Sequence, residues 1–153
     1  MAALTIERMT KFAGVVPARG TYPIAANTRI FKGSLVVLNS SGQAIPGNTI
    51  ANGAAIAVGR SSATYDNRTG SEAGGAAAAL DVEVEFGVFA WDSAGAADLI
   101  AADDVGKLAY VVDDQTVALT SSTGARIAAG VITEFRNGQA YVWMGPHVFP
   151  LTA

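Results

Sequence analysis

The pattern of apolar and polar positions between residues 106 and 144 predicts a series of short strands. The apolar runs are rich in Val, Ile, Tyr, Phe and Trp, which fit the pleated surface of a sheet, and they cover residues 108–112, 116–119, 127–135 and 140–144. Turn-forming clusters separate the runs, at residues 113–115, 121–124 and 137–138. The last cluster is Asn137-Gly138, and Asn-Gly between two apolar runs is a strong hairpin signal because both residues tolerate positive φ. We therefore expect an antiparallel meander.

The first half of the chain carries similar runs. Strands are predicted at residues 28–31, 35–38, 43–45 and 54–61, with turns at residues 32–34 and 39–42 and at Pro46-Gly47. The run at residues 54–61 consists mainly of small apolar residues, which indicates a buried strand. Residues 63–75 form the longest polar stretch, and their Gly-rich end predicts a mobile loop.

A long strand is predicted over residues 81–91. Apolar and acidic residues alternate from 81 to 86, so one face is expected to be buried and the other wet. Gly87 then interrupts the alternation. Without a bulge, Phe89 and Trp91 fall on the acidic face; a bulge at Gly87 shifts the parity and turns both aromatic rings inward. We favour the bulge, and the alternative places both rings in a subunit contact.

The segment between these two regions predicts a short helical turn over residues 97–106. Asp103 or Asp104 is expected near its start, and Gly106 is expected to end it in the left-handed conformation.

The last strand is expected to bury its aromatic residues. Period-two spacing places Tyr141 and Trp143 on one face, with Val142 opposite. We expect the aromatic face to pack into the core. On this interpretation Trp143→Ala costs about 3–5 kcal/mol, the usual range for removing a buried aromatic side chain.

The chain is expected to consist of an N-terminal arm, residues 1–14, and a single β domain, residues 15–153. The arm is interpreted either as an edge strand or as a partner-binding segment, and its candidate contact residues are Leu4, Ile6, Met9 and Phe12. About eight to ten short strands and no long helix indicate an all-β fold. The predicted architecture is an antiparallel β-sandwich, a jelly roll or a barrel, with a loose arm and one short helical turn.

Composition excludes several classes of function. Charged residues make up 15% of the chain, against roughly 25% in soluble domains, so much of the surface is uncharged and part of it is expected to contact partners. The net charge is −3 and the basic residues are scattered, which argues against nucleic acid as a partner. The absence of cysteine excludes disulfides and thiolate sites.

Membrane insertion and secretion are not expected either. No window approaches the roughly 18 apolar residues that span a bilayer. Charged residues at Glu7, Arg8 and Lys11 interrupt any signal-peptide core. Asn67-Arg68-Thr69 matches a glycosylation acceptor, which is not expected to be used without secretion.

The sequence offers no convincing catalytic or metal site, so we expect a protein that is not an enzyme and needs no cofactor. His147 is the single histidine and lacks the partners of a triad or metal site. Asp103-Asp104 and Asp113-Asp114 are compatible with calcium, but neighbouring aspartates are ordinary in turns. Glu83 and Glu85 share a strand face that is expected to be wet, which does not favour glycosidase chemistry.

Several stretches resemble the capsid decoration, or cement, proteins of tailed phages, which are small head proteins encoded beside the major capsid protein. The resemblance runs from residue 28 to residue 144, and residues 105–118 are its most distinctive part. The matching stretches are residues 30–39 with 44–47, 57–60 with 66–67, 87–89, 102–107 with 110–118, 129–131 and 142–143. The arm and the last seven residues lie outside it.

The resemblance implies a non-enzymatic structural protein on the exterior of the virion capsid. Such a protein is made in the bacterial host cytoplasm, binds the major capsid protein and strengthens its lattice against the pressure of the packaged DNA. It also implies self-association as a homodimer or homotrimer. Two alternatives remain open: another virion component, such as a head-fibre base or a tail protein, and a carbohydrate-binding β-sandwich, which requires an exposed aromatic platform.

Overall fold

The computed structural model describes residues 18–47 and 56–146, and the structural statements that follow concern these residues. The strands are β1 (Arg19–Pro23), β2 (Thr28–Ile30), β3 (Leu35–Leu38), β4 (Ala44–Pro46), β5 (Ile56–Ser61), β6 (Tyr65–Asn67), β7 (Asp81–Glu85), β8 (Gly87–Ser93), β9 (Leu108–Val111), β10 (Thr116–Ala118), β11 (Ala128–Arg136) and β12 (Gln139–Met144). Two 3-10 turns, η2 (Ala96–Asp98) and η3 (Ala102–Asp104), lie between β8 and β9. With 49% strand and 6% helix, the predicted all-β class is confirmed.

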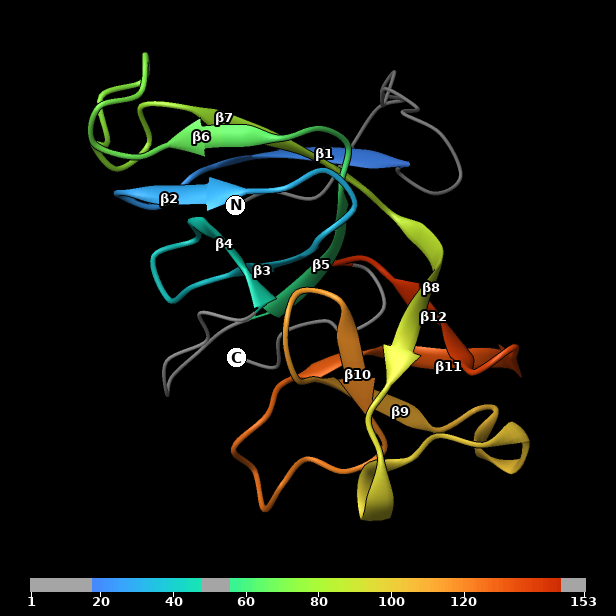
Figure 1. Ribbon diagram of the computed structural model, residues 1–153. Helices are drawn as coiled ribbons and strands as arrows, with labels where there is room; N and C mark the ends of the chain where they lie inside the picture. Colours follow the sequence, from blue (N-terminus) through green and yellow to red (C-terminus); the bar gives the residue numbers. More distant parts are fainter. Residues whose placement is uncertain (1–17, 48–55, 147–153) are drawn as a thin grey trace, which may run out of the picture.

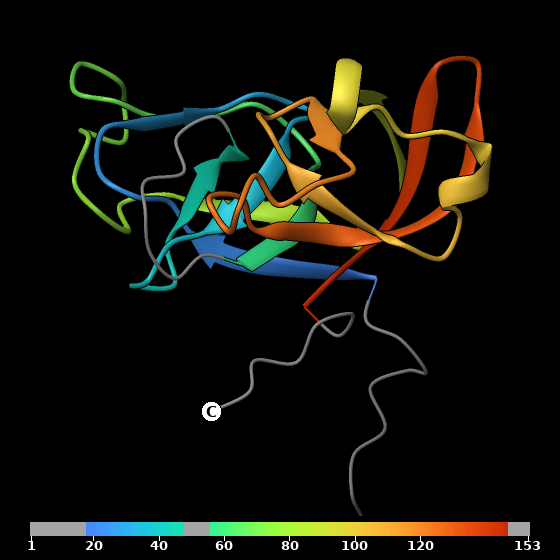
Figure 2. The same ribbon diagram turned by 90° about the horizontal axis from the view of Figure 1, so that it is seen from below.

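The strands form three assemblies. A five-stranded sheet has the order β1-β7-β5-β3-β4, a small sheet pairs β2 with β6, and a closed barrel has the order β10-β8-β12-β11-β9. In Figures 1 and 2 the strands of the first half of the chain, blue to green, gather on one side, and the barrel strands, yellow to red, gather on the other. Every strand pair is antiparallel except β10 with β8, which is parallel.

The predicted long strand at residues 81–91 is divided between two assemblies. Its first part is β7, in the sheet, where Val82 and Val84 are fully buried. Its second part is β8, in the barrel, where Trp91 is 4% exposed and Val88 is 50% exposed. The inward positions therefore change parity at Gly87, whose φ is 152°. The predicted parity shift is confirmed, but its cause is a passage from one sheet to another and not a bulge within one sheet.

Strands β3 and β5 lie between the core of the barrel and the second core, and side chains on both faces of these strands are buried. Leu35, Val37 and Ala57 pack in the core of the barrel. Val36 and Val58, which point the other way, pack in the second core beneath β2 and β7. This two-sided burial explains why the two runs show no polar alternation.

The face of β12 predicted to be buried is in fact the outer face, so that prediction is wrong. Ala140, Val142 and Met144 are fully buried, whereas Trp143 is 40% exposed. A five-stranded barrel is narrow, and its interior already holds the Trp91 ring, whose Nε1–H donates to the Met144 Sδ at 3.2 Å. Small and aliphatic side chains from β12 fill the remaining space.

The predicted meander is only partly correct. The β11–β12 hairpin turns at Asn137-Gly138, where φ is 52° and 76° as the Asn-Gly signal requires. The β9–β10 hairpin also forms as predicted. However, β11 pairs with β9 and not with β10. The free edge of β10 is taken by β8 instead, and this pairing closes the barrel.

The polar stretch at residues 63–75 begins with a short strand that was not predicted, β6, which pairs with β2 through the whole of its length. The single helical turn predicted at residues 97–106 is replaced by two separate turns, η2 and η3. Gly106 does adopt the expected left-handed conformation, with φ 90°.

Close packing of β11 on β12 makes a glycine necessary at position 130. A Cβ atom on Gly130 would lie 2.1 Å from the backbone oxygen of Trp143. We predict that Gly130→Ala lowers the free energy of unfolding by roughly 1–3 kcal/mol, the usual cost of overpacking. Thermal unfolding checks this against Gly95→Ala, because Gly95 has φ −98° and open space around its Cβ position. Equal melting temperatures for the two variants would contradict the close approach.

Candidate docking surface

The paired carboxylates of β7 are engaged by arginines. Glu83 Oε1 lies 3.0 Å from Arg19 Nη1, and Glu85 Oε2 lies 2.5 Å from Arg60 Nη2. The hydrogen bond from Arg60 lowers the pKa of Glu85 below its ordinary value. Arg60 also stacks on the Phe89 ring, 4.6 Å from its centroid. These contacts assign the two glutamates to local ion pairs that hold neighbouring strands together.

The two aspartate pairs serve turns. Asp104 is 4% exposed, and its carboxylate accepts the Ala101 N–H at 2.8 Å and Lys107 Nζ at 2.7 Å. The Asp113 Oδ1 accepts the Gln115 N–H at 2.9 Å within the β9–β10 turn. Within the described part of the chain, no group of three or more His, Cys, Asp or Glu residues is placed to hold a metal ion. His147 lies outside the described residues.

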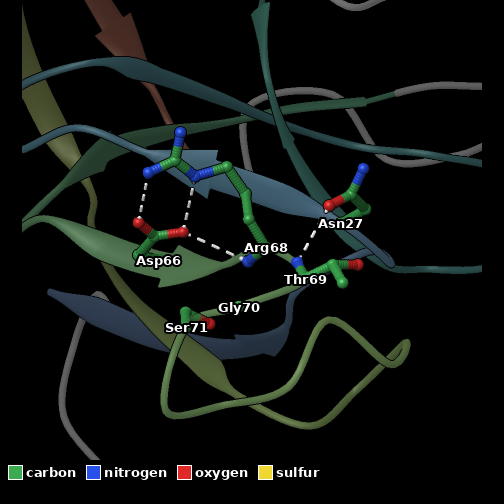
Figure 3. Close-up of a pocket in the computed structure, with 6 residues that line it drawn as sticks. All are labelled: Asn27, Asp66, Arg68, Thr69, Gly70 and Ser71. Atoms are coloured by element: carbon green, nitrogen blue, oxygen red, sulfur yellow. Dashed lines mark hydrogen bonds and ion pairs between the residues drawn. The ribbon is translucent and has the colours of Figure 1, made fainter.

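A polar cavity of about 410 Å³ opens beside β6. In Figure 3 the Asp66 and Arg68 side chains face each other across two contacts, and Asn27 points to the Thr69 backbone. The Arg68 hydrogen bond lowers the pKa of Asp66 to about 2. Both charges in the cavity are thus paired with each other, and no other charged side chain lines it. The cavity offers no free charge for a ligand.

The glycosylation pattern at Asn67 is structural. Asn67 is fully buried, and its Nδ2 donates to the Ala25 and Ala76 backbone oxygens at 3.1 and 2.8 Å. The side chain therefore ties β6 to two loops and is not accessible for modification.

An apolar row crosses the outside of the barrel, and it is the candidate docking surface. Val88, Trp143, Val131 and Leu108 come from four neighbouring strands, and each lies directly opposite the next in the strand register. Residues directly opposite each other share one face of a sheet. Val88, Trp143 and Leu108 are 50%, 40% and 37% exposed, and Val131 is half-buried. At about 4.8 Å between strands, the row extends roughly 14 Å.

Few unpaired charges border this row. On one side, Arg136 stacks 4.7 Å above the Tyr141 ring and lies 3.4 Å from Glu134. On the other side, Lys107 is bound to Asp104, which raises the pKa of the Lys107 ammonium. The charged side chains of Arg136 and Lys107 are thus each held by an acidic partner.

Such a row is suited to binding a protein surface. Contiguous exposed apolar side chains on a soluble protein mark sites of association. Tryptophan is the residue type that most often dominates the energy of a protein interface.

The structure does not test the sequence-predicted contact residues. Leu4, Ile6, Met9 and Phe12 are all outside the described residues, so their prediction stands untested. The row itself was missed. A signal for it was present in β8, because the parity shift that turns Phe89 and Trp91 inward also turns Val88 outward.

Comparisons with known proteins do not identify a relative: the chain matches no protein-family model, no curated protein and no solved structure. None of the helical segments in the described ranges is long and apolar enough to cross a membrane.

The two tryptophans should respond differently to solvent and to mutation. Trp91→Ala is predicted to cost about 3–5 kcal/mol because it empties the barrel, whereas Trp143→Ala should cost roughly 1–2 kcal/mol from partial burial. Acrylamide quenching checks the same point in full-length Trp91→Phe and Trp143→Phe. The protein that keeps Trp143 should be quenched strongly and the one that keeps Trp91 weakly. Stronger quenching of Trp91 than of Trp143 would contradict these positions and would support the prediction from sequence that the Trp143 face of β12 packs into the core.

The buried Asp104 carboxylate should make the stability of the protein depend on pH in the acidic range. Hydrogen bonds from Lys107 and the Ala101 N–H lower the pKa of the Asp104 carboxyl from the ordinary 3.8. The ionised carboxylate therefore contributes to the free energy of unfolding at pH values above 3.8, and this contribution is lost as the pH falls through the folded-state pKa. We predict that Asp104→Asn lowers the melting temperature at pH 7 and that the difference from wild type shrinks towards pH 3. The exposed neighbour provides a control, Asp103→Asn. A difference that stays constant with pH would contradict the ionised state.

Proposed function

We propose that this protein is a non-enzymatic structural component of a virion that binds the outside of an icosahedral capsid and stabilises the lattice of the major capsid protein. The observation that carries the proposal is the apolar row Val88–Trp143–Val131–Leu108. It gives an all-β protein with few charges a surface for docking on another protein. The resemblance of residues 28–144 to capsid decoration proteins supplies the identity of the partner.

Stabilising a shell requires contact with more than one subunit. The row is one contact, and the arm residues Leu4, Ile6, Met9 and Phe12 are proposed as a second. Ordering an arm costs about 1–2 kcal/mol per residue in backbone freedom, so each arm contact is weak by itself. A homodimer or homotrimer that attaches through several arms and rows offsets this cost through effective concentration. The protein would be made in the bacterial host cytoplasm and would function on the capsid exterior.

The proposal predicts that a charge in the row weakens capsid binding without unfolding the protein. Val88→Asp places an acid in the row, and co-sedimentation with decoration-free heads should weaken by roughly tenfold or more, since a tenfold loss corresponds to only about 1.4 kcal/mol. Leu99→Asp is the matched control, because Leu99 is 52% exposed and lies outside the row. Deletion of residues 1–12 should also reduce binding strongly while changing the melting temperature little.

Three results would contradict the proposal or part of it. Full binding by both Val88→Asp and the truncated protein would remove the row and the arm as docking elements. Global unfolding of the truncated protein would show that the arm is an integral strand of the domain. Recovery of the protein on tails and not on heads would select the alternative of a head-fibre base or tail component.

The exposure of Trp143 also favours a second candidate, a carbohydrate-binding module. An exposed indole can stack on a sugar ring, and a glycan array tests this directly. The neighbours of Trp143 in the row are Val88 and Val131, whose side chains cannot form hydrogen bonds with the hydroxyl groups of a sugar. Ligand sites normally add polar groups that fix orientation, so the row fits a protein partner better.

A further inference from the structure

A second cavity, of about 240 Å³, opens between two turns that are distant in the sequence. One wall is the turn that joins β2 to β3, and the other wall is the β9–β10 turn. The residues that line the cavity are Phe31, Lys32, Gly33, Ser34, Asp114 and Gln115. The four residues of the apolar row are not among them, so the cavity is a separate feature of the surface.

Hydrogen bonds hold both walls of this cavity in place. The Leu35 N–H donates to the Asp114 backbone oxygen at 2.8 Å, which joins one turn to the other. The Ser34 hydroxyl donates to the Phe31 backbone oxygen at 2.8 Å and closes the β2–β3 turn. Because the walls are already ordered, a ligand that enters the cavity does not have to order them, and less conformational entropy is lost on binding.

Phe31 supplies an aromatic surface to the cavity. The residue is 49% exposed although its ring is large and apolar. The Arg29 guanidinium lies 4.3 Å from the centroid of the ring, over one of its faces. The attraction between this cation and the ring helps to hold the ring in its orientation. An aromatic ring beside a polar cavity favours a ligand that has an apolar face and polar edges.

The polar groups that line the cavity are of mixed character. Lys32 brings an ammonium group that can only donate hydrogen bonds, and Asp114 brings a carboxylate that can only accept them. Gln115 brings an amide that does both. The charges of Lys32 and Asp114 are opposite, so together they do not favour a ligand with a large net charge. Hydroxyl groups both donate and accept, so a neutral compound with several hydroxyl groups can bond to all three side chains.

We propose that this cavity binds one neutral pyranose ring of a glycan, stacked on Phe31. The C–H face of a pyranose is apolar and packs on an aromatic ring, while its hydroxyl groups would bond to Lys32, Asp114 and Gln115. The volume is below the roughly 300–1,000 Å³ of sites for drug-sized ligands, which limits the cavity to a single sugar ring. This site does not include Trp143, and it does not depend on which partner the apolar row binds.

Nuclear magnetic resonance titration of the full-length protein tests the proposal. The probes are the methyl glycosides of glucose, galactose and mannose, which are neutral single rings. Because so small a ligand gains little free energy on binding, we expect a dissociation constant of roughly 1–10 mM for at least one of them. That glycoside should shift the amide signals of Phe31, Gly33 and Gln115 in a saturable manner and leave the amide signal of Val88 unchanged.

Two substitutions in the cavity and one outside it show where the sugar binds. Phe31→Ala removes the stacking surface and should weaken binding roughly tenfold or more. Asp114→Asn keeps the size of the side chain but removes its charge, and should weaken binding roughly threefold or more. Leu99→Ala is the control, because Leu99 is 52% exposed and does not line the cavity, so its affinity should equal that of wild type. Melting temperatures report whether each variant is folded, and Asp114→Asn decides if Phe31→Ala is not.

Three outcomes would overturn the proposal. The first is the lack of a saturable shift with any of the three glycosides. The second is wild-type affinity in both Phe31→Ala and Asp114→Asn. The third is binding that is lost in Trp143→Ala and kept in Phe31→Ala, which would assign the sugar to the apolar row. Folded Phe31→Ala should still co-sediment with decoration-free heads like wild type, so a failure of the sugar site is distinguishable from a failure of the proposed capsid contact.

Discussion

The fold depends on the continuous segment formed by β7 and β8, which buries one face of the strand in β7 and the opposite face in β8. In β7 the even-numbered side chains face the core of the sheet, and in β8 the odd-numbered side chains face the core of the barrel. The change is made at Phe86-Gly87, and Gly87 adopts a φ of 152° that residues with a Cβ rarely adopt. Strands β3 and β5 then fit between the two cores because each of them is apolar on both faces.

The narrow barrel selects which residues can be inside. Its interior combines one large ring, Trp91, with small side chains, which include Ala109, Ala129 and Ala140. Alternating small and large residues is how a small barrel fills its interior without voids. The larger residues of β12, Tyr141 and Trp143, are consequently on the outside. The partial exposure of Trp143 is thus a result of how the barrel is filled.

Local signals in the sequence predicted the hairpins and the fold class well, because they depend on residues close in the chain. Asn137-Gly138 fixed its turn through its own conformational preferences, and Gly87 was identified from a break in alternation. The face of β12 could not be predicted in the same way, since both of its faces are apolar and only the size of the barrel decides between them. The parallel pairing of β10 with β8 and the strand β6 depend on partners distant in sequence, which local patterns do not specify. Of the candidate site, Val88 alone had a local signal.

The stability of the barrel and the nature of its surface are linked at β8. If the parity did not change at Gly87, Val88 would point inward and Trp91 would point to solvent. The core would then lose its largest ring, and the outer row would lose the valine that stands opposite Trp143. A substitution at Gly87 that favours regular extended backbone therefore acts on both features together. Selection for a well-filled barrel is sufficient to keep Val88 on the surface, and a partner that binds the row uses a surface that the fold itself maintains.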